Sequence, residues 1–350
     1  MVDEFVMIFE GCYTALVTPM KRSFEIDFTG LERLIEFQVE EGVEGIVVMG
    51  TTGESSTLDW EEHKTVTKAV HTGIDGKALT IAGTGSNSTK EAFEGTSFAD
   101  ELGVETALLI DPYYNGPSSL EIRKEYVEPL ARGFPKMEFI PYIIPGRTGT
   151  QLLPQDLAIL HTTFDNVNAV KEGTGDLTNM ALTRKVCGDD FCILSADDEK
   201  TYDMMTSPQI RANGVISVIS NIAPAAVQEM VEALNRGNNQ RGLEVAKALD
   251  PLFEIVTVRT EEETLYGPRT VKARNPLACK TMMNITGMPS GPCRQPLGRM
   301  TKAGIDVVLE SLRTVYEDNP WVLQSIEASF DVDLGERLYN TQYWKDLHYA

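Results

Sequence analysis

The segment EGIVVMGTTGES (residues 44–55) joins a short apolar run to a turn that contains two glycines. Both faces of the run are apolar, which is typical of a strand buried in a parallel sheet. Seven further runs have the same character. The eight runs are GCYTALVTP (11–19), EGIVVMG (44–50), LTIAGTG (79–85), ETALLIDP (105–112), EFIPYIIP (138–145), VNAVKEG (167–173), CILSADD (192–198) and NGVISVI (213–219).

Segments with helical periodicity lie between most of these runs, for example at 30–42, 88–103 and 153–164. Eight such βα units have the size and order of an α/β fold of the (β/α)8 TIM-barrel type. A doubly wound parallel sheet is the alternative. The chain lacks the GxGxxG opening that often marks that fold, so we favour the barrel.

Helical patterns continue beyond the eighth run, at 224–237, 240–256 and 301–317. We therefore predict a catalytic barrel over residues 1–236 and a C-terminal helical region over 237–350, with an extended tail from about Asn319. The charged stretch at 259–274 is predicted to be a loop or a short hairpin. No Gly/Ser-rich linker separates the two regions, which argues against a flexible two-domain arrangement.

The formal net charge of −21 argues against a nucleic-acid partner, and a small anionic substrate would need a local positive site. Five cysteines and four histidines show no metal-ligand spacing, so we expect a reduced protein without a metal. The N-terminus lacks the pattern of a signal peptide, and no apolar run is long enough to cross a membrane. These features predict a cytoplasmic protein with no membrane partner.

Lys171 stands at the end of the sixth apolar run, just before a glycine turn. A lysine in such a place either extends its ammonium to solvent or is buried, which lowers its pKa and produces a nucleophilic amine. For an isolated lysine the first interpretation is the more common. The other strand ends decide between the two, because active sites of (β/α)8 barrels lie at the C-terminal ends of the strands.

Three other strand ends carry polar groups that suit an anionic keto acid. The turn GTTGES (50–55) offers free amides and hydroxyls for a carboxylate, and YY at 113–114 and Tyr142 offer phenols. Arg147 offers a planar guanidinium for a second carboxylate. Each feature alone has an ordinary structural explanation. Together with Lys171 they are the groups required for Schiff-base chemistry on an α-keto acid.

These motifs resemble the pyruvate-dependent class I aldolase family that includes dihydrodipicolinate synthase and N-acetylneuraminate lyase, from about Gly11 to Met300. GIVVMGTTGES with Glu62 downstream resembles one family signature, and Tyr142 with Pro145 and AVKEGTG resembles a second. PYYN, GRTG and SADD followed by GVISV are more similar to the synthase branch than to the lyase branch.

The resemblance implies that Lys171 forms an imine with pyruvate, whose carboxylate lies on Thr51 and Thr52, while Ile216 lines the pocket. The enamine would then attack L-aspartate 4-semialdehyde to give 4-hydroxy-tetrahydrodipicolinate, a step in lysine and diaminopimelate biosynthesis. No cofactor would be required. Within the same family, the alternative is an aldolase, lyase or hydratase-aldolase that acts on a longer 2-keto acid, and outside catalysis it is a silent keto-acid sensor.

The resemblance also assigns the remaining catalytic groups. Tyr142 would be the central proton carrier, linked through Thr51 to Tyr114, and Arg147 would hold the carboxylate of the aldehyde. The tyrosine equivalent to Tyr114 comes from a neighbouring subunit, which implies a homodimer or homotetramer. Ile143 departs from the small polar residue usual at its position and bears on the second substrate.

L-Lysine is expected to inhibit the protein, because several positions resemble the effector site of regulated synthases. Glu91 would bind the α-amino group of the effector, Asn87 and Tyr113 would form hydrogen bonds, and Trp60 would cover the aliphatic stem. The positions are Ser55, Ser56, Trp60, His63, Asn87, Glu91 and Tyr113.

Overall fold

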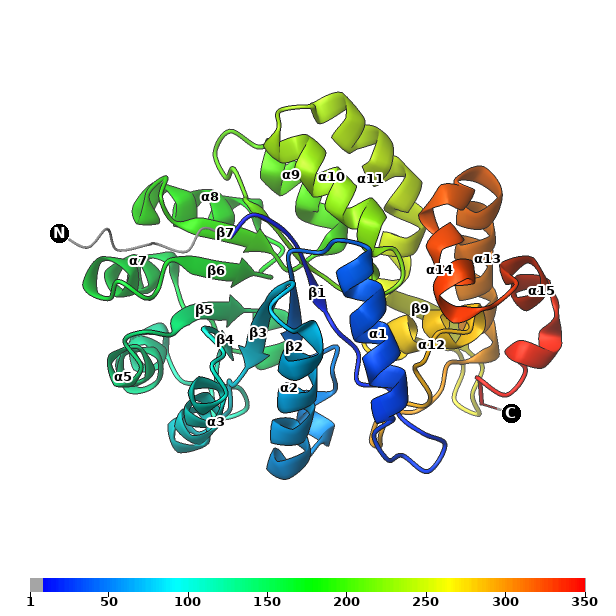
Figure 1. The fold of residues 1–350 in the computed structure, drawn as a ribbon, viewed down its shortest axis with the longest axis horizontal. Helices are drawn as coiled ribbons and strands as arrows, with labels where there is room; N and C mark the ends of the chain where they lie inside the picture. Colours follow the sequence, from blue (N-terminus) through cyan, green and yellow to red (C-terminus); the bar gives the residue numbers. More distant parts are fainter. Residues whose placement is uncertain (1–8, 350) are drawn as a thin grey trace.

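Eight parallel strands close into a barrel in the computed structural model, which describes residues 9–349 (Figure 1). Each strand pairs with its neighbour in sequence, and β1 pairs with β8 to complete the ring. The predicted (β/α)8 barrel is confirmed, and the open doubly wound alternative is wrong. The strands are β1 (Gly11–Ala15), β2 (Gly45–Val48), β3 (Leu79–Gly83), β4 (Thr106–Ile110), β5 (Glu138–Ile143), β6 (Ala169–Glu172), β7 (Cys192–Ser195) and β8 (Gly214–Ser217).

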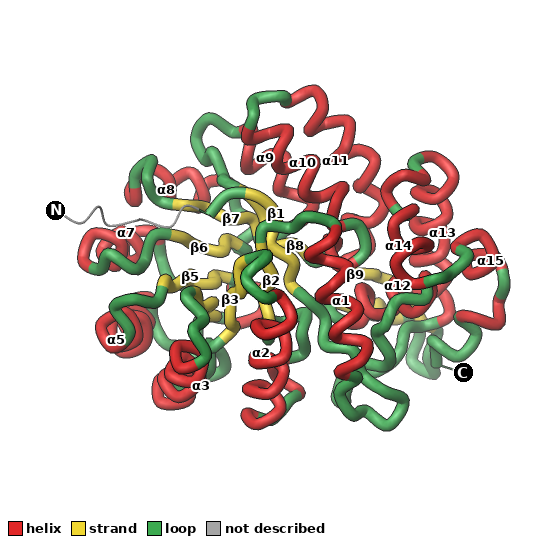
Figure 2. The backbone as a smooth tube through the Cα atoms, in the orientation of Figure 1, coloured by secondary structure: helices red, strands yellow, loops and turns green. Residues whose placement is uncertain are grey.

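Helices lie outside the strands (Figure 2). Short 3-10 turns follow several strand ends, among them η1 (Ser55–Thr57), η3 (Asp198–Lys200) and η4 (Ile219–Asn221). The barrel helices are α1 (Phe28–Glu40), α2 (Trp60–Ile74), α3 (Thr89–Glu101), α4 (Ser119–Glu121), the π-helical η2 (Ile122–Val127), α5 (Glu128–Gly133), α6 (Pro145–Thr148), α7 (Pro154–Thr163), α8 (Leu177–Cys187), α9 (Thr201–Thr206) and α10 (Pro224–Asn235).

The C-terminal helices predicted at 240–256 and 301–317 are present as α11 (Asn239–Phe253) and α13 (Lys302–Asp318). The sequence did not single out the other three helices of this region, which are α12 (Leu277–Thr286), α14 (Gln324–Phe330) and α15 (Leu334–Tyr339). In Figure 1, α12 to α15 lie together on one side of the barrel, while α11 lies beside α10. The 3-10 turns of the region are η5 (Glu254–Val256), η6 (Pro320–Val322) and η7 (Thr341–Tyr343). The boundary at residue 237 stays a prediction.

The charged stretch at 259–274 forms an antiparallel hairpin of β9 (Thr257–Glu262) and β10 (Arg269–Arg274). Of the two possibilities raised by the sequence, the hairpin is confirmed. β9 packs on α13 and β10 on α12, so the hairpin is held by the C-terminal helices.

The strands are apolar on both faces because each face packs in a different hydrophobic cluster. Side chains such as Val47, Leu108 and Ile216 fill the barrel interior, while a larger cluster packs between the strands and the helices. Within residues 9–349, no helix is long and apolar enough to cross a membrane. Because neighbouring strands are in register, Tyr142 on β5 lies beside Lys171 on β6.

The turn after β2 ends at a helix cap that fixes the start of α2. At its far end, Asp59 accepts a hydrogen bond from the amide of Glu62 (2.9 Å), and the Glu62 carboxylate accepts one from the amide of Asp59 (3.2 Å). This capping box starts α2 at Trp60. The residues between the end of β2 and Asp59 therefore belong to neither element and form a polar turn at the C-terminal end of the barrel.

Candidate active site

Lys171 lies at the C-terminal end of β6 and is buried, with 6% of its surface exposed. Its Nζ atom is 4.1 Å from the centroid of the Tyr142 ring. Within residues 9–349, the amine has no hydrogen bond or ion pair, so the aromatic face is its main close contact. The sequence left open whether Lys171 reaches solvent or is buried, and the structure places it inside.

Burial lowers the pKa of Lys171 from 10.5 to about 7, because a charged ammonium loses its hydration there. The positive charge of Arg147 lowers this pKa further, whereas Asp198 and Asp197 oppose the shift. A substantial fraction of the amine is therefore neutral near pH 7. A neutral amine is the form that attacks a carbonyl carbon.

Asp198 is a buried carboxylate that raises the pKa of Lys171 and that the sequence analysis did not single out. The Ser217 hydroxyl donates to it, and so do the amides of Val218 (2.9 Å) and Ile219 (3.3 Å). Burial raises its pKa to about 6, although these donors lower it. Its place in η3, three residues after β7 ends, was the available signal, since the loops that follow the strands define the site.

Tyr142 is buried beside the amine, and burial raises the pKa of its phenol to about 12. Arg147 and a hydrogen bond with the Thr51 side chain act in the opposite direction. The phenol stays protonated near neutral pH, so it has a proton to donate and a hydroxyl partner through which to exchange it. The structure brings together Lys171, Tyr142 and Thr51, as predicted.

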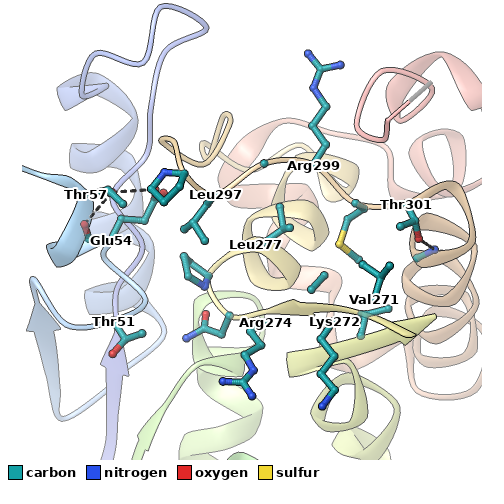
Figure 3. Close-up of a pocket in the computed structure, with 18 of the residues that line it drawn as sticks. Thr51, Glu54, Thr57, Val271, Lys272, Arg274, Leu277, Leu297, Arg299 and Thr301 are labelled. Carbon is teal, nitrogen blue, oxygen red and sulfur yellow. Dashed lines mark hydrogen bonds between the residues drawn. The ribbon is translucent and has the colours of Figure 1, made fainter. Parts of the chain in front are cut away.

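Thr52 and Arg147 are joined by Asn275, a residue from beyond the barrel. The Asn275 side-chain amide donates to the Thr52 hydroxyl (2.9 Å), and the Arg147 guanidinium donates to the Asn275 carbonyl (3.1 Å). A cavity of about 670 Å³ opens next to this network (Figure 3). Because Asn275 follows the hairpin, no local motif near the strand ends could have identified it.

Arg147 lies on α6 at the mouth of the cavity, where it is accessible to solvent. Desolvation nevertheless lowers its pKa, and the charge of Arg274 on the hairpin adds to the lowering. Ile216 is fully buried in the barrel interior, in the same hydrophobic cluster as Tyr142. Arg147 thus follows β5 on α6 and Ile216 lies in the barrel interior, while their roles in substrate binding stay predictions.

Tyr114 does not enter this site within a single chain. Its side chain is 93% exposed, and its φ of 76° is in the left-handed region that a non-glycine residue adopts at a cost. The adjacent Tyr113 turns instead toward a second cavity. Of the predicted catalytic residues, Tyr114 alone is directed to solvent.

The second cavity has a volume of about 340 Å³ and contains most of the predicted effector residues. The Glu91 carboxylate accepts a hydrogen bond from Ser86 (2.5 Å), and the Trp60 ring lies 4.7 Å from that of His63. Burial lowers the pKa of His63 to about 4, so its ring is neutral near pH 7. The predicted residues that line the cavity are Ser55, Ser56, Trp60, His63, Glu91 and Tyr113.

Asn87 is the one predicted effector residue that does not line this cavity. Its side-chain oxygen accepts a hydrogen bond from the amide of Tyr113 (2.7 Å). The contact holds the backbone of the tyrosine pair, so Asn87 acts on the cavity through Tyr113. Thr51 and Arg147 line both cavities.

A buried amine beside a phenol, at the C-terminal end of a (β/α)8 barrel, is the arrangement of a class I aldolase. Within residues 9–349, no group of three or more His, Cys, Asp or Glu side chains is placed to hold a metal ion. The model of the dihydrodipicolinate synthetase family matches residues 8–314, and the chain belongs to this family.

Relatives agree with that assignment. The chain is 37% identical to the 4-hydroxy-tetrahydrodipicolinate synthase of Methanococcus maripaludis over 84% of this chain and 94% of the relative. It is 39% identical to the synthase of the same name from Syntrophus aciditrophicus, over the same shares. A dihydrodipicolinate synthase from Cyanidioschyzon merolae, solved with lysine bound, has a TM-score of 0.79 and 32% identity over 88% of this chain and 98% of that one.

The lowered pKa predicts how adduct formation depends on pH. With pyruvate and borohydride, we expect a reduced adduct on Lys171 whose initial rate rises about tenfold per pH unit below about pH 7 and levels above pH 8, because the neutral amine is the reactant. Peptide mapping by mass spectrometry measures the rate. A rate still rising steeply toward pH 10, or undiminished labelling in Lys171→Arg, would contradict the assignment.

Proposed function

We propose that this protein condenses pyruvate with L-aspartate 4-semialdehyde to form 4-hydroxy-tetrahydrodipicolinate, as a carbon–carbon bond-forming lyase of lysine and diaminopimelate biosynthesis in the cytoplasm. The observation that carries the proposal is the buried Lys171 amine, which has a pKa of about 7 and lies 4.1 Å from the Tyr142 ring. Membership of the family and the names of the relatives support the particular reaction.

The first half of the reaction takes place on Lys171. Its neutral amine attacks the C2 carbonyl of pyruvate, and loss of water leaves an imine, while Thr51 and Thr52 bind the pyruvate carboxylate. Tyr142 supplies and removes protons through its phenol, which burial keeps protonated. Loss of a methyl proton then gives the enamine. The covalent catalyst is Lys171 itself, so we propose that no further cofactor takes part.

The second half forms the new carbon–carbon bond. The enamine carbon attacks the aldehyde carbon of the semialdehyde, whose carboxylate is held by Arg147. The amino group of the semialdehyde then attacks the imine carbon, which closes the ring and releases Lys171. Ile143 is the last residue of β5, and its aliphatic side chain is buried in the hydrophobic cluster between the strands and the helices, so it does not alter the polar lining of this site.

The purified protein should convert pyruvate and aspartate semialdehyde to 4-hydroxy-tetrahydrodipicolinate, identified by mass spectrometry. Arg147→Ala should lower kcat/KM for the semialdehyde by about tenfold to a hundredfold, because a charge-assisted bidentate contact is lost. Adduct formation with pyruvate should stay within about twofold at a pH well above the pKa of Lys171, where the amine is neutral with or without the charge of Arg147.

Lys171→Arg is the inactive control. A protein that forms the pyruvate adduct but condenses it only with a longer or uncharged aldehyde would refute the proposed reaction and favour another aldolase of the family. Equal loss of both steps in Arg147→Ala would assign Arg147 a structural role instead.

We further propose that Tyr114 completes the proton relay of a neighbouring subunit, so that the working enzyme is a homodimer or a homotetramer. Its full exposure and its positive φ support this, because a strained, outward-facing phenol gains nothing within its own chain. An equivalent contact from the partner would place its hydroxyl near Thr51.

Mixed variants test this arrangement. Lys171→Ala and Tyr114→Phe subunits should each have low activity, and mixing equal amounts after dissociation should restore about a quarter of the wild-type rate, because half of the dimers are mixed and each has one complete site. The separate variants, treated identically, are the controls. No gain on mixing would show that Tyr114 does not act across subunits.

L-Lysine is proposed to bind the second cavity as an inhibitor. Glu91 would accept from its α-amino group and Trp60 would cover its stem, and both residues line the cavity. The related Cyanidioschyzon merolae enzyme was solved with lysine bound, which supports a lysine effector for this family. An occupant would lie next to Thr51 and Arg147.

Glu91→Gln should raise the lysine concentration for half-inhibition by about tenfold or more, because a charge-assisted hydrogen bond is lost. Its matched control is Glu94→Gln on the same helix, where the carboxylate forms an exposed pair with Lys90 and does not line the cavity. Inhibition assays on the two variants measure the lysine concentration for half-inhibition. An active wild-type enzyme that millimolar lysine does not inhibit, or equal effects of both substitutions, would contradict the proposal.

A further inference from the structure

The hairpin at 257–274 supplies positive charge to the cavity of about 670 Å³, which shares Thr51 and Arg147 with the candidate active site. Lys272 and Arg274 on β10 line this cavity together with Arg147. In Figure 3 both hairpin side chains extend in the same direction, whereas Arg299, on the opposite rim, points away. This local positive charge contrasts with the formal charge of −21 for the whole chain.

The one acidic residue in the lining does not offset these cations. Glu54 is buried and bonded to Lys280 at 2.6 Å, so its charge is already compensated. Within residues 9–349, no ion pair involves Arg147, Lys272 or Arg274, and the guanidinium of Arg274 makes no hydrogen bond to another residue. The cavity wall is therefore left with an excess of positive charge.

The position of Arg274 in the chain brings it close to the substrate-binding network. It is the last residue of β10 and directly precedes Asn275, which bonds to both Thr52 and Arg147. Desolvation lowers the pKa of Arg147, and the charge of Arg274 adds to this lowering. Two guanidinium groups thus repel one another across a common space, and an anion between them would relieve that repulsion.

We infer that Arg274 is a second carboxylate-binding residue that acts with Arg147 on the aldehyde substrate, and that Lys272 strengthens the local positive field. This inference rests on the proposed function. It adds a specificity determinant that comes from the hairpin rather than from a barrel strand. Aldehydes that carry a carboxylate are favoured, because two guanidinium groups bind it while neutral aldehydes gain nothing.

Kinetics of Arg274→Gln test the inference. The KM for aspartate semialdehyde should rise about tenfold, with kcat and the rate of the pyruvate adduct within about twofold, because only binding of the second substrate is weakened. Arg274→Lys should be intermediate, since it keeps the charge and loses the planar fork. The substituted side chain is exposed, so the fold is expected to persist.

Arg269→Gln is the matched control, because it removes the same charge from the same strand at a residue that does not line the cavity. It should leave the KM within about twofold. An unchanged KM in Arg274→Gln, or an equal rise in both variants, would overturn the inference while the condensation reaction stands.

A binding measurement separates the inference from the proposed function. Calorimetry with succinate, which has two carboxylates and needs no turnover, should show about tenfold weaker binding to Arg274→Gln than to the wild type or to Arg269→Gln. If the wild type makes no product from aspartate semialdehyde, the proposed function fails and succinate alone decides the role of Arg274. Equal succinate affinities in all three proteins would overturn that role.

Discussion

A buried ion pair between Glu54 and Lys280 holds the polar turn of the site against the C-terminal helices. The two charges are 2.6 Å apart, with at most 1% of either side chain exposed. The Lys280 ammonium also donates to the carbonyls of Thr18 (3.1 Å) and Pro292 (2.8 Å), and the amide of Arg294 donates to Glu54 (2.8 Å). Loss of one partner from such a pair costs about 3–5 kcal/mol, because the other charge stays buried.

The same pair explains why α12 belongs to the site although it lies outside the barrel. Lys280 fixes α12 against the turn that carries Thr52, and Asn275 stands just before that helix. The hydrogen bond from Asn275 to Thr52 depends on this docking. Two buried lysines thus have opposite roles: Lys280 keeps its charge compensated and supports the structure, whereas Lys171 lacks such a partner and its lowered pKa leaves a reactive amine.

The sequence predicted the features that follow from local order along the chain. Parallel strands place all their C-terminal ends at one rim, so Lys171, Tyr142, Thr51 and Arg147 could be assigned to one site from eight apolar runs and their turns. The family resemblance added their expected roles. The helices at 240–256 and 301–317 were also predicted correctly, and the stretch at 259–274 forms the hairpin that was one of its two predicted alternatives.

The remaining features depend on contacts between distant segments, which periodicity does not encode. Asn275 and Thr52 are 223 positions apart, and Glu54 and Lys280 are 226 apart. No local pattern indicates that such residues meet. The outward position of Tyr114 agrees with the family resemblance, which assigns it to a neighbouring subunit, but no local pattern indicated its unusual φ of 76°.

The two cavities are close enough for direct coupling. Thr51 and Arg147 line both, so a molecule in the second cavity would contact side chains that also form the candidate active site. The amide of Tyr113 is held by Asn87, and Tyr113 is followed at once by the strained Tyr114. An occupant of the second cavity would therefore act on the proposed proton relay through shared walls and one peptide bond, and no long chain of intermediate residues is needed to transmit its effect.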